Sequence, residues 1–191
     1  DYLYVLGGLN LDTSTPTASV IRLNLTNPTG SWDDAEVTNL PEARHYHSSV
    51  IHGNYVYVLG GWSNGEAISS VIRLDLTNPT GSWDDAGVTN LPNTYYSHSS
   101  NINGDYVYTI GGIANGNSTA SVIRLDLTNP TGSWDDAGVT DLPNTRYFHS
   151  SVVHVNYLYV LGGVVSSVNT SSSVIRLDLT NPTGSWDDAG V

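Results

Sequence analysis

The stretch Val71–Pro92, VIRLDLTNPTGSWDDAGVTNLP, recurs almost letter for letter along this chain of 191 residues. Near-copies of it begin at Val20, Val122 and Val174. Their tryptophans, Trp32, Trp83, Trp134 and Trp186, are 51, 51 and 52 residues apart. A unit that recurs at this period predicts a tandem repeat, in which each copy buries its apolar surface against the next.

Each copy is predicted to form four short β-strands. In the copy that contains Trp134, runs of β-forming residues predict strands over 98–103, 106–110, 121–127 and 133–142. Turn-forming residues separate the runs, among them the double glycine Gly111-Gly112. Apolar residues nowhere show helical spacing over three turns, so we expect an all-β fold. Short strands at a period of about 50 residues are typical of a propeller.

Composition excludes several classes of partner. The net charge is −12, from 18 acidic residues against six basic ones, which argues against nucleic acid because binding to phosphates needs clustered basic side chains. No apolar run approaches the roughly 18 residues of a membrane span, so we expect none. With no cysteine, the chain has neither disulfides nor thiolate metal sites.

In each repeat a Tyr-rich strand ends in Gly-Gly and is followed by a strand with Arg and Asp, a Trp, Leu-Pro and Arg-x-x-His. This order resembles the Kelch repeat over essentially the whole chain. The resemblance implies a β-propeller with one four-stranded antiparallel blade per repeat. We predict a single domain over 1–191, with repeats at about 1–41, 42–92, 93–143 and 144–191.

The chain opens with the second strand of a blade, Tyr2–Leu6, so the innermost strand of the first blade is absent from the sequence. Backbone groups left unpaired there cost about 1 to 3 kcal/mol each if they are buried. We expect the chain to be part of a longer repetitive polypeptide whose continuation supplies the strand, which leaves four, six or seven blades open. A neighbouring molecule is an alternative donor, and this would make the propeller a link in a polymer.

Ten recurring residues are predicted to tie the blades together. The resemblance implies that an innermost-strand histidine bonds the backbone of the neighbouring blade; the alternative is a ring of imidazoles around a metal. An arginine on the third strand has an aspartate two residues later on the same face, which predicts an ion pair, since a buried unpaired charge is costly. These residues are His47, His98, His149, Arg22, Arg73, Arg124, Arg176, Asp75, Asp126 and Asp178.

Two copies depart from this pattern. Tyr95 stands where two other copies have Arg44 and Arg146, and Asn24 stands where the others have aspartate. We expect these two blades to be less tightly tied.

A pair of aspartates follows every repeated tryptophan: Asp33-Asp34, Asp84-Asp85, Asp135-Asp136 and Asp187-Asp188. Calcium is one interpretation, but adjacent side chains on a strand point to opposite faces and do not converge on one ion. We favour charges on the outermost strand that prevent edge pairing with other sheets. We therefore predict no metal site.

The repeats diverge most between the second and third strands, over 9–18, 62–69, 113–120 and 164–172. Variable loops on a constant frame are typical of a recognition surface. Trp62, with Tyr95 or Tyr96, has the chemistry to stack on a sugar ring. Asn24, Asn117 and Asn169 begin Asn-x-Ser/Thr sequons, which favours a secreted or extracellular glycoprotein.

We predict neither catalytic residues nor a cofactor, because the repeats supply rings of like groups and not one asymmetric constellation. A glycosidase needs two carboxylates in one cleft, and the unrepeated acids are scattered. Two functions remain. We favour a structural, self-associating building block of a filament or surface scaffold. The alternative is a lectin-like or protein-binding propeller that recognises a glycan or protein through its divergent loops.

Overall fold

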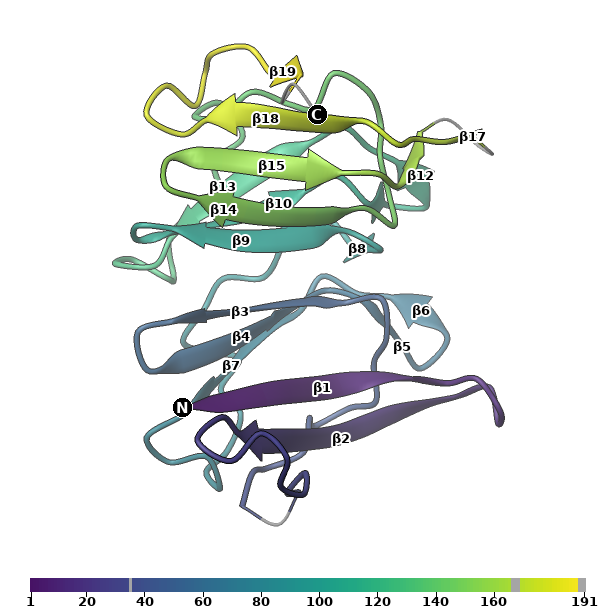
Figure 1. Cartoon of the computed structure of the whole chain (residues 1–191), viewed down its shortest axis with the longest axis vertical. Helices are drawn as coiled ribbons and strands as arrows, with labels where there is room; N and C mark the ends of the chain where they lie inside the picture. Colours follow the sequence, from purple (N-terminus) through teal and green to yellow (C-terminus); the bar gives the residue numbers. More distant parts are fainter. Residues whose placement is uncertain (35, 166–168, 189–191) are drawn as a thin grey trace.

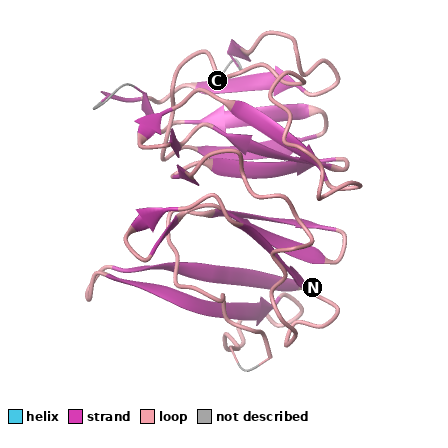
Figure 2. Cartoon of the chain, turned by 180° about the vertical axis from the view of Figure 1, so that it is seen from behind, coloured by secondary structure: helices cyan, strands magenta, loops and turns pink. Residues whose placement is uncertain are grey.

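The computed structural model describes residues 1–34, 36–165 and 169–188, and its regular structure consists entirely of β-strands (Figure 2). Within these ranges there is no helix, and so none that could cross a membrane. The strands form four successive blades, with the first and fourth at opposite ends of the long axis (Figure 1).

The main strands of the first blade are β1 (Tyr2–Asn10) and β2 (Thr15–Asn24). The second blade has β3 (Ser48–His52), β4 (Tyr55–Leu59) and β7 (Val71–Asp75). The third has β9 (Ser99–Asn103), β10 (Tyr106–Ile110) and β13 (Val122–Asp126). The fourth has β14 (Ser150–His154), β15 (Tyr157–Leu161), β18 (Val174–Asp178) and β19 (Asp187–Asp188).

Three blades share one antiparallel register. The tyrosine that starts the second strand faces the last residue of the third strand, as in Tyr55↔Asp75, Tyr106↔Asp126 and Tyr157↔Asp178. The inner strand of each, β3, β9 or β14, pairs on the other side. In the described part of the first blade, β1 pairs only with β2. The all-β fold and the open first blade are therefore confirmed.

The prediction of a fourth strand over 133–142 is wrong in extent. In each of the first three blades the fourth strand consists of a single β-bridge: Arg22↔Asp33, Arg73↔Asp84 and Arg124↔Asp135. In the fourth blade it is the two-residue strand β19. In the third blade the Asp135 carboxylate accepts the Gly138 N–H at 3.0 Å, which turns the chain away from the sheet. The sequence pattern predicted β-structure at the position of the bridge, but it did not predict the turn that the Asp135 side chain stabilises.

The predicted loops after the double glycines contain short hairpins. They are β5 (Trp62–Ser63) with β6 (Glu66–Ala67), β11 (Ile113–Ala114) with β12 (Asn117–Ser118), and β16 (Val164–Val165) with β17 (Asn169–Thr170). A further strand, β8 (Tyr95–Tyr96), pairs with β11. All lie at one end of the blades, on the right in Figure 1, which we call the loop end. In the first blade β1 runs on through its double glycine with a bulge between Leu6 and Gly8.

The apolar core is divided between successive blades. One cluster joins the first and second blades, with Val20, Val58 and Leu74 at its centre. A second joins the second and third blades, and the last joins the third and fourth. Among the described residues, no core cluster joins the fourth blade to the first.

The double glycines bring each blade against the next. Gly60 has φ +56°, and a Cβ there would lie 2.5 Å from the carbonyl oxygen of Tyr95 in the following blade. The N–H of Gly61 donates to that same oxygen at 2.7 Å. Only glycine combines this backbone conformation with so close an approach.

Replacing Gly60 with alanine tests this contact against a matched glycine. Gly53 has the same φ of +56° but no atom within 4 Å of a Cβ. We expect Gly53→Ala to cost about 1 kcal/mol from conformation alone. Gly60→Ala should cost at least about 2 kcal/mol more, because the Tyr95 carbonyl must move. Urea unfolding measures both; equal losses would contradict the interblade contact.

Candidate functional site

Two of the three repeated histidines, His98 and His149, join neighbouring blades through serine hydroxyls. His98 Nε2 lies 2.7 Å from Ser48 Oγ, and His149 Nε2 lies 2.8 Å from Ser99 Oγ, each serine belonging to the inner strand of the preceding blade. The same serines bond a hydroxyl of the next blade, in the pairs Ser48–Ser100 and Ser99–Ser151, at 2.6 Å. His98 and His149 thus each bridge two blades through a serine hydroxyl, a partner that the sequence analysis did not name.

Burial keeps these histidines neutral. The pKa of His98 is lowered to about 3, first by burial and then by the neighbouring His47 and His149. Burial, followed by the charges of Arg44 and Arg146, lowers the pKa values of His47 and His149 to about 4. The described residues hold no group of three or more His, Asp and Glu side chains placed to bind a metal.

The repeated arginines form ion pairs, but with carboxylates other than those expected. Arg73 pairs with Asp84 at 3.0 Å, Arg124 with Asp135 at 3.2 Å and Arg176 with Asp187 at 2.8 Å. Each guanidinium also lies over a tyrosine ring of its own blade, as Arg73 does over Tyr55 at 4.6 Å. Burial acts to lower the pKa of Arg73, but hydrogen bonds to Tyr57 and Asp84 outweigh it and raise that pKa.

The prediction that these arginines pair with Asp75, Asp126 and Asp178 is therefore corrected. Each of those aspartates instead caps the turn that follows it, as Asp75 Oδ1 accepts the N–H of Thr77 at 2.8 Å and its hydroxyl at 2.7 Å. These bonds lower the pKa of Asp75. Asp126 and Asp178 make the same turn. The first aspartate of each Asp pair is thus part of an ion pair, which sequence spacing did not reveal.

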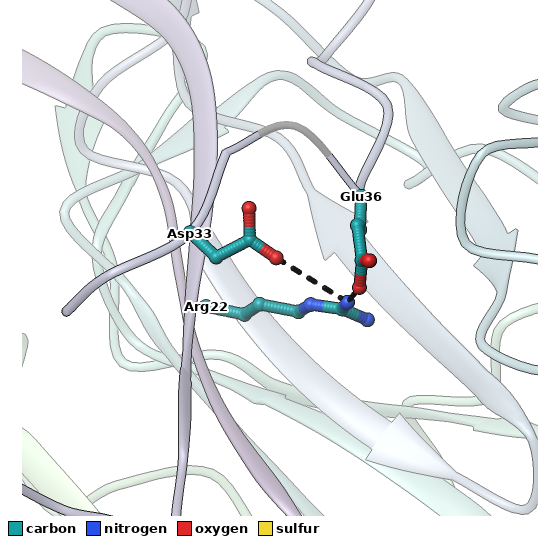
Figure 3. Close-up of polar contacts among 3 residues, drawn as sticks. All are labelled: Arg22, Asp33 and Glu36. Atoms are coloured by element: carbon teal, nitrogen blue, oxygen red, sulfur yellow. Dashed lines mark hydrogen bonds and ion pairs between the residues drawn. The ribbon is translucent and has the colours of Figure 1, made fainter. Parts of the chain in front are cut away.

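In the first blade, the repeated arginine has a second acidic partner that, among the described residues, the other blades lack. Arg22 lies between Asp33, at 3.4 Å, and Glu36, as Figure 3 shows. Glu36 replaces the glycine that lies against the guanidinium in the next two blades, Gly87 and Gly138. Asn24, whose side chain accepts the Thr26 N–H at 2.9 Å, belongs to the turn and not to this ion pair. Asn24 in place of aspartate therefore leaves the ion pair of Arg22 intact, contrary to our expectation that this blade is less tightly tied.

Two further arginines hold the loop end together. Arg44 is buried and donates to the carbonyl of Gly60 at 3.3 Å. Arg146 donates to the carbonyl of Gly162 at 2.5 Å and to Ser173 Oγ at 3.0 Å. Their signal in the sequence was the Arg-x-x-His motif, from whose loss at Tyr95 we expected a less tightly tied blade.

The predicted ligand-binding aromatics have different environments. Trp62 and Tyr96 are half-buried, and their rings meet edge-on with centroids 5.1 Å apart. Tyr95 is 2% exposed and belongs to the core between the second and third blades. Its side chain is unavailable to a ligand, so its place in the predicted site is corrected.

Sequence reasoning missed a second aromatic pair. Tyr46 and Phe148 are 44% and 56% exposed, and their rings meet edge-on with centroids 5.6 Å apart. They occupy equivalent positions, one residue before the inner-strand histidines of the second and fourth blades. The third blade has the small, buried Ser97 at this position, which lets the two rings meet across it.

The backbone fixes this pair. Tyr46, Ser97 and Phe148 all have positive φ, between 53° and 57°. The Ser97 N–H donates to the Tyr46 carbonyl at 2.8 Å, and the Phe148 N–H donates to the Ser97 carbonyl at 3.1 Å. Left-handed backbone is unfavourable for such residues and persists only where the surroundings impose it. The two rings are therefore presented at the loop end by a rigid frame.

The sequon asparagines Asn24, Asn117 and Asn169 are all exposed. Their glycosylation stays a prediction.

Comparison with known proteins shows similarity to a Kelch-repeat family model and to several Kelch proteins. A family model, the KLHDC2/KLHL20/DRC7 Kelch-repeats domain, matches residues 1–189. Kelch repeat protein C2 of Vaccinia virus is 31% identical over 126 residues, which cover 66% of this chain and 23% of that protein. The Kelch domain-containing protein 10 homolog of Drosophila melanogaster is 29% identical over 92% of this chain and 31% of its own length. Kelch-like protein 40 of Xenopus tropicalis is 24% identical over 94% and 28%. The chain thus spans less than a third of each relative.

The buried histidines predict acid sensitivity. Their pKa values in the folded chain lie below the value of about 6.5 in the unfolded chain, so the unfolded chain binds more protons between these values. The free energy of unfolding should therefore fall as the pH falls through that window. Each histidine contributes at most about 1.4 kcal/mol per pH unit.

Urea titrations at several pH values between about 6.5 and about 5 measure this slope, above the range in which aspartates titrate. We expect His98→Gln to reduce the slope by about 1 kcal/mol per pH unit. His154→Gln, at an exposed ring, controls for the substitution. An unchanged slope in His98→Gln would contradict a buried neutral histidine.

Proposed function

The chain belongs to the Kelch-repeat family, and we propose that it is a non-catalytic module that binds another protein through the loop end of its blades. Kelch repeats generally mediate protein–protein interaction. The observation that carries the proposal is the exposed pair Tyr46 and Phe148. Aromatic side chains held in one conformation lose little entropy on binding and dominate many interfaces.

Charge indicates the kind of partner. The chain has a net charge of −12, and the exposed Glu42 and Glu66 lie at the loop end, near Arg44 and in the β5–β6 hairpin. Acidic groups around an aromatic centre attract a basic segment and speed its association. We propose a partner segment that combines aromatic or aliphatic side chains with lysine or arginine.

Selection from a displayed library of random short peptides tests this function. We expect enrichment of peptides with that combination of side chains. Tyr46→Ala and Phe148→Ala should each weaken a selected peptide by about tenfold or more, as truncation of a central aromatic does elsewhere. Val155→Ala is the control, because Val155 is 72% exposed in the turn after β14, away from the loop end.

Two results would refute the proposal. One is that the selected peptides bind both aromatic variants as tightly as the original chain. The other is that peptides are not enriched while a glycan array gives a signal that is lost in Trp62→Ala, which would favour the lectin-like function.

The exposed faces of the end blades favour a second candidate, the self-associating building block. Leu3 and Val5 are 49% and 44% exposed, but their equivalents Val56 and Val58 are 2% and 0% exposed and pack against the first blade. At the other end, Leu161 is 37% exposed, whereas its equivalent Leu59 is 1% exposed. The fourth blade of one copy is thus chemically suited to the first blade of another. Such head-to-tail contact gives a ring or a filament.

Sedimentation velocity over a range of concentrations tests this candidate. Head-to-tail assembly predicts oligomers that grow with concentration and that are lost in Val5→Glu and in Leu161→Glu, since each places a charge in the new interface. Val155→Glu should leave assembly unchanged. A single monomeric species throughout would exclude the building block. The exposed sequon asparagines support the further proposal that the chain is extracellular.

A further inference from the structure

Two Asn-Gly pairs form the tips of short hairpins at the loop end. Asn64-Gly65 joins β5 to β6, and Asn115-Gly116 joins β11 to β12. Both residues of each pair have positive φ, 51° and 85° in the first hairpin and 47° and 80° in the second. This is the two-residue turn that Asn-Gly favours. All four residues are exposed, so the two hairpins present the same dipeptide in the same backbone conformation.

The two hairpins differ in the side-chain amide of the asparagine. Asn115 Oδ1 accepts the N–H and the hydroxyl of Thr94, both at 3.3 Å, and its Nδ2 donates to Asn93 Oδ1 at 2.8 Å. Among the described residues, the side chain of Asn64 has no hydrogen-bond partner, and neither has the N–H of Gly65. The Asn115 amide is therefore held in place, whereas the Asn64 amide can rotate.

The sequence explains this difference. The second blade has Glu42 and Ala43 at the positions that Asn93 and Thr94 occupy in the third. Ala43 has no hydroxyl to donate, and Glu42 accepts the hydroxyl of Ser63 at 3.2 Å. The residues that hold the amide in one hairpin thus have no counterpart in the other.

The remaining Asn-Gly pair of the chain has a different backbone. Asn103 is the last residue of β9, where it is half-buried and pairs with Tyr106 of β10. A reaction that rotates the backbone at Asn103 must first break this strand pairing, so we expect Asn103 to be protected.

We propose that Asn64 is a site of spontaneous deamidation and isomerisation in the folded chain. Asparagine is a chemically labile residue. The Gly65 nitrogen loses its proton to a base from solvent and attacks Asn64 Cγ, so that an N–Cγ bond forms while the Cγ–Nδ2 bond breaks and ammonia leaves. Water then opens the resulting succinimide at either carbonyl, which gives aspartate or isoaspartate without oxidation or reduction. Glycine favours the attack because it has no side chain, and no atom lies within 4 Å of its Cβ position.

The reaction changes the loop end in two ways. It adds a carboxylate to a hairpin that already carries the exposed Glu66. Isoaspartate also lengthens the backbone of a two-residue turn, and that turn sets the pairing of Trp62 with Ala67. Modification of Asn64 therefore alters the surface around Trp62, whose ring meets that of Tyr96.

Incubation of the folded chain at mildly alkaline pH tests the proposal. Peptide mass spectrometry follows conversion at each of the three asparagines. We expect Asn64 to convert at least about tenfold faster than Asn115, because Asn115 must break three hydrogen bonds before its amide can rotate. Asn103 should also convert more slowly than Asn64. In urea, where the chain is unfolded, all three should convert at similar rates.

Exchanging residues between the two blades provides matched variants. Asn93→Glu with Thr94→Ala gives the third blade the residues of the second, and it should speed conversion of Asn115 by about tenfold. The reciprocal variant, Glu42→Asn with Ala43→Thr, should slow conversion of Asn64. Circular dichroism establishes that each variant is folded.

Three results would overturn the proposal. One is that Asn115 or Asn103 converts as fast as Asn64 in the folded chain. Another is that Asn64 stays intact in the folded chain over a period in which it converts in urea. The third is an unchanged rate at Asn115 in the exchanged variant, which would show that its hydrogen bonds do not determine the choice of site.

Discussion

The structure depends on one contact that recurs between successive blades, the hydrogen bond from the second glycine of the first three double glycines to a carbonyl of the next blade. Gly8 donates to Arg44, Gly61 to Tyr95 and Gly112 to Arg146, at 2.7 to 2.8 Å. Because Gly7, Gly60 and Gly111 have no side chain, the following blade approaches closely enough for its repeated histidine to lie against the glycine. The histidine and serine bonds between inner strands follow from that approach.

The same contact explains why the two ends of the chain differ from its middle. The second and third blades have a neighbour on both sides, and each contributes buried apolar residues to a core cluster on both faces. Among the described residues, the first blade packs against a neighbour on one face only and has no inner strand beside β1, and the fourth blade packs against a neighbour on one face only. Apolar groups that a continuous ring would cover are therefore exposed at Leu3, Val5, Val152 and Leu161. The proposal of self-association derives from this incomplete repetition.

The structural features that could be predicted from the sequence are those that recur with a fixed period. The copies of VIRLD and the Tyr-rich runs form strands in one register, and in the described part of the first blade β1 pairs only with β2. Partners brought together by tertiary structure were not predictable from spacing. Asp84 was read as an edge charge although it pairs with Arg73, eleven residues away. Tyr95 was a candidate to stack on a sugar ring, although the facing blade buries it. The Tyr46–Phe148 pair depends on a left-handed backbone that no local residue preference indicates.

Amide hydrogen exchange in β1 and β4 tests the account most directly, since these strands have nearly the same sequence, YLYVL at 2–6 and YVYVL at 55–59. Pairing on both sides should make the amides of β4 exchange slowly, whereas β1, with one free edge, should include amides that exchange much faster. Equal protection along the two strands in the isolated chain would contradict the open first blade.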